Sequence, residues 1–164
     1  MVNFRSGYRL LGTLCVMVCL PLATTIATDA TILKKQLLET IAKVKNGETS
    51  NDRTDAAEHL SELTDGIDPT QVDGSTLKKM VSLLHSSEDS VRAWVAASLG
   101  ELGPRAKAIA APALLALLPK ADCLVGSLTS APAIRLALDR MGVTPPPPAT
   151  CETDQHGLPT KPRH

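Results

Sequence analysis

The chain has 164 residues, with 17 basic and 17 acidic side chains and only one tryptophan, one tyrosine and one phenylalanine. Nucleic-acid binding uses basic patches and often aromatic stacking platforms, and this composition provides neither. We therefore exclude nucleic acid as a partner, and the shortage of aromatic rings also disfavours sugar binding by stacking.

The first 27 residues have the pattern of a secretory signal peptide. Arg5 and Arg9 form a positive start, residues 10–22 are mostly apolar, and Thr25-Ile26-Ala27 offers a cleavage site, which we place within 23–30. The apolar run is too short for a stable membrane anchor. We therefore expect an exported protein, periplasmic or secreted, without stable membrane insertion after signal cleavage.

Two other fates of this segment remain open. One is an uncleaved signal anchor. The other is lipidation at Cys15 or Cys19, although a lipoprotein needs small residues before the cysteine and Leu14 and Val18 stand there. Cleavage leaves 15 basic and 17 acidic side chains and a single aromatic residue, Trp94.

Apolar residues recur with helical spacing along the body of the chain. Positions i, i+3, i+4 and i+7 share one face of an α-helix. Such runs occur at Leu33, Leu37, Ile41 and Val44; at Leu77, Met80, Val81 and Leu84; at Val91, Val95, Leu99 and Leu102; and at Leu114, Leu117 and Leu118. No run alternates with period two for long enough to indicate a strand. The predicted fold class is all-α.

Capping residues mark where these helices begin and end. Ser75 is expected to cap one helix, and Ser86 with Asp89 fits a capping box before Val91. Pro112 suits the first turn of a later helix, where no amide donor is needed. Two glycine-then-proline signals indicate helix ends, at Gly103-Pro104 and at Gly142 before Pro145.

The helices repeat. A shift of 39 residues superimposes Arg53 on Arg92 and Leu60 on Leu99, and a third copy follows at 134–142 with one residue missing. Two helices per unit, repeated at this interval, are typical of an α-solenoid, in which neighbouring units stack to bury their apolar faces. We predict about three helix pairs over residues 31–143.

One family pattern is similar. Leu83-Leu84, a polar turn, Val91-Arg92, Ala96-Ala97, Leu99-Gly100, Leu102-Gly103 and Pro112 resemble HEAT repeats of the short bacterial type found in bilin lyases. The resemblance is good in 76–118, fair in 33–66 and weak in 132–143, and Ser86 stands where the family often has Asp. It implies a binding scaffold and carries no catalytic residues.

The C-terminal segment, residues 144–164, starts with Pro145–Pro148, which favour polyproline II over a helix. We expect this tail to be largely disordered except near Cys151. In an oxidising compartment, Cys123 and Cys151 form an even pair that suggests a disulfide. Two free thiols or an intermolecular bond are the alternatives.

Four residues are candidates for partner binding. Trp94 lies at the edge of an apolar helix face, either as a hot-spot anchor or as core between repeats. Arg53, Arg92 and Arg135 occupy equivalent places in the repeats. They either form a ladder that meets a partner's carboxylates or, as we favour, pair inside the protein, with the recurring acids as natural partners: Glu62 and Glu101.

No catalytic, metal or cofactor site is predicted. Glu58, His59 and Glu62 form at most part of a metal site, because zinc needs three or four ligands and no second cluster accompanies them. Motifs of hydrolases, phosphate-binding loops and zinc proteases are missing. We therefore expect a monomeric, non-catalytic scaffold that binds another protein. The alternatives are a lyase-like accessory protein acting on a cofactor-bearing partner and a purely structural envelope protein.

Overall fold

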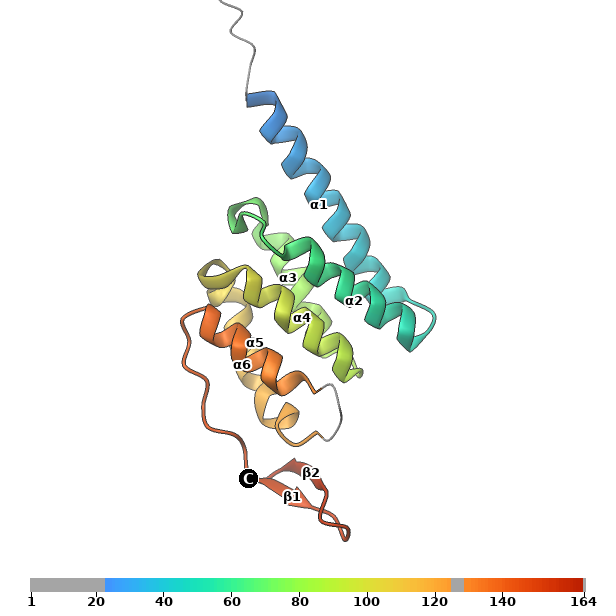
Figure 1. Cartoon of the computed structure of the whole chain (residues 1–164), viewed down its shortest axis with the longest axis vertical. Helices are drawn as coiled ribbons and strands as arrows, with labels where there is room; N and C mark the ends of the chain where they lie inside the picture. Colours follow the sequence, from blue (N-terminus) through green and yellow to red (C-terminus); the bar gives the residue numbers. More distant parts are fainter. Residues whose placement is uncertain (1–22, 125–128, 164) are drawn as a thin grey trace, which may run out of the picture.

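The computed structural model describes residues 23–124 and 129–163, and the side chains from Asp29 onward. This part of the chain contains six α-helices, which confirms the all-α prediction for its body (Figure 1). The helices are α1 (Ala23–Asn46), α2 (Ser50–Thr64), α3 (Gly74–Ser82), α4 (Asp89–Glu101), α5 (Lys107–Ala121) and α6 (Ser130–Arg140). Short 3₁₀ turns lie at Pro69–Gln71, Leu83–His85 and Gly103–Arg105.

The helices lie in two layers. In the first layer α2, α4 and α6 lie side by side, and α4 contacts both neighbours (Figure 1). In the second layer α3 contacts α1 on one side and α5 on the other. Each first-layer helix also contacts the helix that precedes it in the sequence, so the chain packs as three successive helix pairs.

The core is built from the apolar faces that the spacing predicted. Leu60 and Leu99, which the 39-residue shift superimposes, are both completely buried. Burying a leucine side chain contributes about 1.5–3 kcal/mol, so the repeated positions are those that hold the layers together. The largest buried side chains are Leu37, Leu60, Leu77, Met80, Leu99, Leu102, Leu114, Leu118, Ile134, Leu138, Met141 and Val72.

A glycine lies where two first-layer helices approach closely. A Cβ atom placed on Gly100 of α4 would lie 3.0 Å from the Cα and 3.1 Å from the Cβ of Ala137 on α6. Two small residues facing each other let the helix axes come close. This spot joins the second and third helix pairs, where α4 and α6 share an extensive interface.

Two of the predicted helix starts are wrong, and the third is displaced. Asp73 caps α3 in place of Ser75, because its carboxylate accepts the amides of both Ser75 and Thr76. Glu88 precedes α4 without a side-chain cap, and α5 begins at Lys107, five residues before Pro112. The predicted ends are confirmed by left-handed backbone at Gly103 (φ 53°) and Gly142 (φ 69°).

The C-terminal tail contains a hairpin that the sequence analysis did not predict. Strands β1 (Cys151–Thr153) and β2 (Pro159–Pro162) pair antiparallel below the helices in Figure 1, and β2 contacts α5. Such short strands need no apolar alternation. Their turn is held instead by the Asp154 carboxylate, which accepts the amides of His156 and Leu158 at 2.8 and 2.9 Å.

The expected signal peptide lies mostly outside the described residues. Only its last five positions, 23–27, are described, and they form the first residues of α1. Among the helices that the structure describes, none combines the length and the apolar character needed to cross a bilayer.

Candidate docking face

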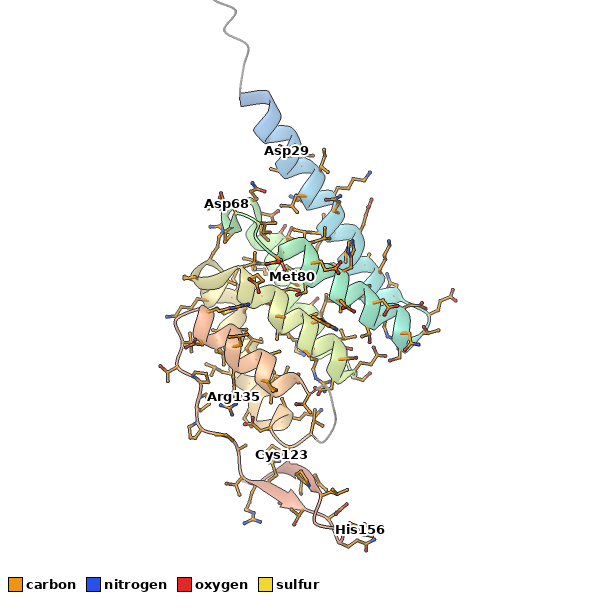
Figure 2. The ribbon with its side chains drawn as sticks, in the orientation of Figure 1. Asp29, Asp68, Met80, Cys123, Arg135 and His156 are labelled. Atoms are coloured by element: carbon orange, nitrogen blue, oxygen red, sulfur yellow. A yellow bond between two sulfur atoms is a disulfide. The ribbon has the colours of Figure 1, made fainter. Side chains whose placement is uncertain are left out.

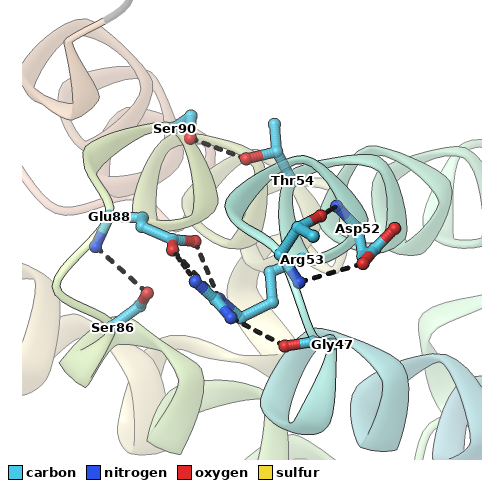
Figure 3. Close-up of polar contacts among 8 residues, drawn as sticks. Gly47, Asp52, Arg53, Thr54, Ser86, Glu88 and Ser90 are labelled. Atoms are coloured by element: carbon cyan, nitrogen blue, oxygen red, sulfur yellow. Dashed lines mark hydrogen bonds and ion pairs between the residues drawn. The ribbon is translucent and has the colours of Figure 1, made fainter.

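The three repeated arginines are all bound by acceptors within the chain. Arg53 of α2 donates from Nε to both carboxylate oxygens of Glu88, at 3.0 and 3.2 Å, and its Nη2 pairs with the same group (Figure 3). Its Nη1 donates to the Gly47 carbonyl at 2.7 Å. These hydrogen bonds hold the pKa of the Glu88 carboxyl below its ordinary value and raise the pKa of Arg53.

Arg92 is buried at the start of α4, with 5% of its surface exposed. Its Nη1 donates to the Ser86 carbonyl at 2.6 Å, and its Nη2 pairs with Asp89 at 2.9 Å. Asp89 also accepts the amide of Ser130 at 2.8 Å and the Ser130 hydroxyl, so this carboxylate joins α4 to α6. A side chain placed this deeply stabilises the stack and offers no surface to a partner.

Arg135 of α6 fastens the tail to the last helix pair. Its Nη2 lies 2.8 Å from Oδ2 of Asp122, and its Nη1 donates to the Pro146 carbonyl at 2.6 Å. Asp122 accepts the Ala149 amide at 2.9 Å as well. Cys123, the next residue, forms the disulfide with Cys151, which confirms the predicted bond (Figure 2).

Each of the three repeated arginines therefore pairs inside the protein, as we favoured, but the acceptors that we predicted for them were wrong. Glu62 pairs with His59 at 3.1 Å and Glu101 pairs with Arg140. The acceptors of the three repeated arginines lie instead in the loops and helix starts beside them. The 39-residue shift identified equivalent positions, but it did not tell which carboxylate would lie nearest.

Trp94, the fourth candidate, is half-buried. Its ring packs against the hydrophobic core, and the same side chain lines a surface hollow of about 260 Å³ between α2 and α4. Trp94 thus packs on the core, as one of the two interpretations expected, and part of its side chain remains accessible at the surface. The other residues that line the hollow are Glu58, Ser61, Glu62, Asp65 and Glu101.

The hollow is strongly acidic. Glu62 and Glu101 have the partners given above, whereas Glu58 and Asp65 belong to none of the ion pairs within the described part of the chain. Both are exposed. From the sequence, Glu58 was considered only as part of a metal site, and Glu62 as part of that site or as an acceptor for an arginine. Asp65 was missed, because nothing local in the sequence places it beside Trp94.

A larger hollow of about 640 Å³ lies between α1 and α2. Its charged lining has three carboxylates, Glu48, Asp52 and Asp55, beside Lys43 and His59, so it is acidic too but contains cationic groups and no aromatic ring. Across residues 29–124 and 129–163, no three His, Cys, Asp or Glu side chains are grouped closely enough to hold a metal ion.

In comparisons with known proteins, no protein family model, curated protein or solved structure matches the chain.

Proposed function

We propose that this protein is an exported, non-catalytic scaffold of HEAT-like repeats that binds another protein through the layer formed by α2, α4 and α6. The observation that carries the proposal is the half-exposed Trp94 in the middle helix of that layer, beside a hollow. Tryptophan is enriched among the few residues that supply most of the energy of an interface.

The packing supports a scaffold. Three helix pairs follow one another, and the repeated leucines Leu60 and Leu99 are buried in equivalent positions, as expected for stacked repeats. Arg53 pairs with Glu88 at the start of the next helix pair, and Arg135 of α6 pairs with Asp122 just after α5, so two of the internal ion pairs tie neighbouring elements of the stack together. A rigid stack presents a surface at little cost in conformational entropy when a partner binds.

Export is supported by the signal-like first 27 residues and by the Cys123–Cys151 disulfide, since such bonds persist in oxidising compartments. N-terminal sequencing of the protein purified from cells tests this part. We expect a mature chain that starts between residues 24 and 31, recovered from the periplasm or the medium. An intact start at Met1 in the cytoplasm would refute export.

Site-specific photocrosslinking tests the docking face. A benzophenone amino acid is placed at Ala97, on α4 one turn from Trp94, and in a matched variant at Ala116, exposed on α5 in the other layer. We expect a discrete protein adduct from position 97 in intact cells and none from position 116. Equal adducts from both positions, or none from position 97, would contradict the proposed face.

A further inference from the structure

The exposed side of α2 is a stripe of negative charge that ends at Trp94. Five carboxylates recur along this helix at intervals of three or four residues, all of them exposed: Asp52, Asp55, Glu58, Glu62 and Asp65. Asp52 and Asp55 line the hollow beside α1, and Glu58, Glu62 and Asp65 line the hollow beside α4. Together they follow the exposed part of α2, where 13 residues of helix extend for about 20 Å. Arg53 lies away from this stripe and is bound to Glu88.

Trp94 adds a feature that the carboxylates alone do not provide. Its indole lines the hollow together with Glu58, Glu62 and Asp65. The face of an indole attracts a cation, and tryptophan does so better than the other aromatic side chains. An aromatic wall next to the carboxylates of Glu58 and Asp65, which belong to no ion pair of the described residues, therefore suits a positively charged side chain that also has an apolar or planar part to stack.

We propose that the hollow between α2 and α4 binds an arginine- or lysine-rich segment of the partner protein, with one cationic side chain stacked on Trp94 and others facing the stripe on α2. This inference rests on the proposed function, because it assumes a protein partner. An extended chain rises about 3.3 Å per residue, so the stripe matches a segment of about six residues.

The geometry favours a polypeptide over a metal ion. The carboxylates are spread along a helix, and within the described side chains they do not converge in a group that could hold a metal. Carboxylates that are spread along a helix match cationic side chains that are spread along a peptide segment. A guanidinium group donates two hydrogen bonds to a carboxylate and also stacks on aromatic rings. An arginine can therefore bind both the carboxylates on α2 and the indole of Trp94.

Intrinsic fluorescence measures this binding directly, because Trp94 is the only tryptophan of the chain. The probe is a synthetic peptide of about six residues that alternates arginine with serine, and its control carries citrulline in place of arginine. We expect saturable quenching by the arginine peptide, weakened by added salt, and none by the citrulline peptide. Equal binding of both peptides would overturn the proposal.

Charge variants locate the site on the surface. Glu58→Gln with Asp65→Asn should raise Kd about fivefold, whereas the matched pair Glu39→Gln with Asp139→Asn, on α1 and α6, should leave it unchanged. All four side chains are exposed, so none of these changes disturbs the core. An equal loss in both pairs would show general attraction to an acidic protein and would refute the site.

Trp94→Phe retains an aromatic face and Trp94→Ala removes it. Read with a fluorescent label on the peptide, Kd should rise about fivefold or more for Trp94→Ala and less for Trp94→Phe. Equal affinities in the wild type and both variants would remove Trp94 from the site. If Trp94→Ala does not fold, the affinities of Trp94→Phe and of the charge variants still test whether the peptide binds in the hollow.

The inference and the proposed function fail in different experiments. A crosslink from position 97 without peptide binding would leave the scaffold intact and refute the basic partner. A second copy of the chain is the competing occupant, since its tail carries Lys161 and Arg163. Self-association in sedimentation that is abolished by Lys161→Gln with Arg163→Gln would assign the hollow to that tail and overturn the proposal.

Discussion

Arg53 on α2 and Glu88 just before α4 form an ion pair that joins the first helix pair to the second (Figure 3). Beside it the hydroxyls of Thr54 and Ser90 lie 2.9 Å apart. Because Glu88 is followed at once by Asp89, which binds Ser130 of α6, the start of α4 contacts both of its neighbours through polar groups.

The Arg53–Glu88 pair predicts a pH dependence of stability. The pKa of Glu88 is lowered in the folded state, mainly by the hydrogen bonds from Arg53, so the ionised form favours folding. This contribution is present above the ordinary carboxyl pKa of 4.5 and is lost as the pH falls through the lower folded value. We therefore expect Glu88→Gln to lower the melting temperature at pH 7 and to differ less from the wild type below pH 4.5.

Thermal unfolding followed by circular dichroism at several pH values measures this difference. Glu39→Gln on α1 is the matched control, since the Glu39 carboxylate is mostly exposed and 3.8 Å from Lys35. Its melting temperature should follow that of the wild type throughout. A Glu88→Gln deficit that stays constant down to pH 2 would contradict the role of the ionised carboxylate.

Gly100→Ala should destabilise the protein, although alanine normally favours a helix over glycine by about 1 kcal/mol. The new methyl group would lie 3.0 Å from the Cα of Ala137, a backbone atom of the packed helix α6. Overpacking of this kind costs about 1–3 kcal/mol. Gly74→Ala at the first residue of α3 is the control, because the nearest atom to its added Cβ is 3.9 Å away.

Urea unfolding of the two glycine variants gives the free energies of unfolding. We expect a lower value for Gly100→Ala and little change for Gly74→Ala. A Gly100→Ala protein as stable as the wild type would mean that α4 and α6 can move apart without loss, and so that their close approach is unimportant.

Removing the Cys123–Cys151 disulfide should cost about 3–4 kcal/mol of stability in the chain-entropy model, since the bond closes a loop with a sequence separation of 28 residues. The double variant Cys123→Ser with Cys151→Ser should unfold at lower urea. A two-stranded hairpin is only marginally stable alone, so we also expect faster hydrogen exchange at its amides.

Hydrogen exchange of residues 149–163 checks the second half of this prediction. The amides of Ala149 and Arg163, which donate to Asp122 and to the Thr150 carbonyl, are the informative ones. Exchange in α2 serves as the internal control and should change little under native conditions. Equal protection of the hairpin with and without the disulfide would show that Arg135 and Asp122 hold the tail by themselves.

Asp89→Ala should lower the free energy of unfolding by on the order of 2–3 kcal/mol, because it removes charged hydrogen bonds to Ser130 and leaves Arg92 without its carboxylate. Ser87→Ala, two residues earlier and exposed, should have almost no effect. Urea unfolding of both variants measures the difference. Equal stabilities would mean that water replaces the lost carboxylate at no cost.

Local sequence patterns predicted where the helices lie and which positions in successive helix pairs are equivalent. The spacing of Leu77 and Met80, or of Val95 and Leu99, requires only that one face of a helix be buried, and burial is what the structure shows. The left-handed glycines at the ends of α4 and α6 were also predictable from local sequence, because a glycine adopts that backbone without strain and a proline just beyond it, Pro104 or Pro145, does not continue a helix.

Two features of the structure were not predicted from local sequence: the residue that caps α3 and the C-terminal hairpin. Ser75 was expected to cap α3, but Asp73 lies two residues earlier and its carboxylate accepts the amides of Ser75 and Thr76, so the helix already begins at Gly74. The hairpin was missed because its strands have three and four residues, and because the disulfide and α5 hold it in place rather than a hydrophobic pattern.

The sequence by itself determined an all-α body of repeated helices, since hydrogen bonds and apolar spacing within a helix are local properties. Only the tertiary structure decided which carboxylate binds each arginine and which surface surrounds Trp94. Arg53 and Glu88 are 35 positions apart, and Trp94 and Asp65, which line one hollow, are about 30 positions apart. Such placements depend on how closely α2, α4 and α6 approach, and small residues such as Gly100 allow a close approach.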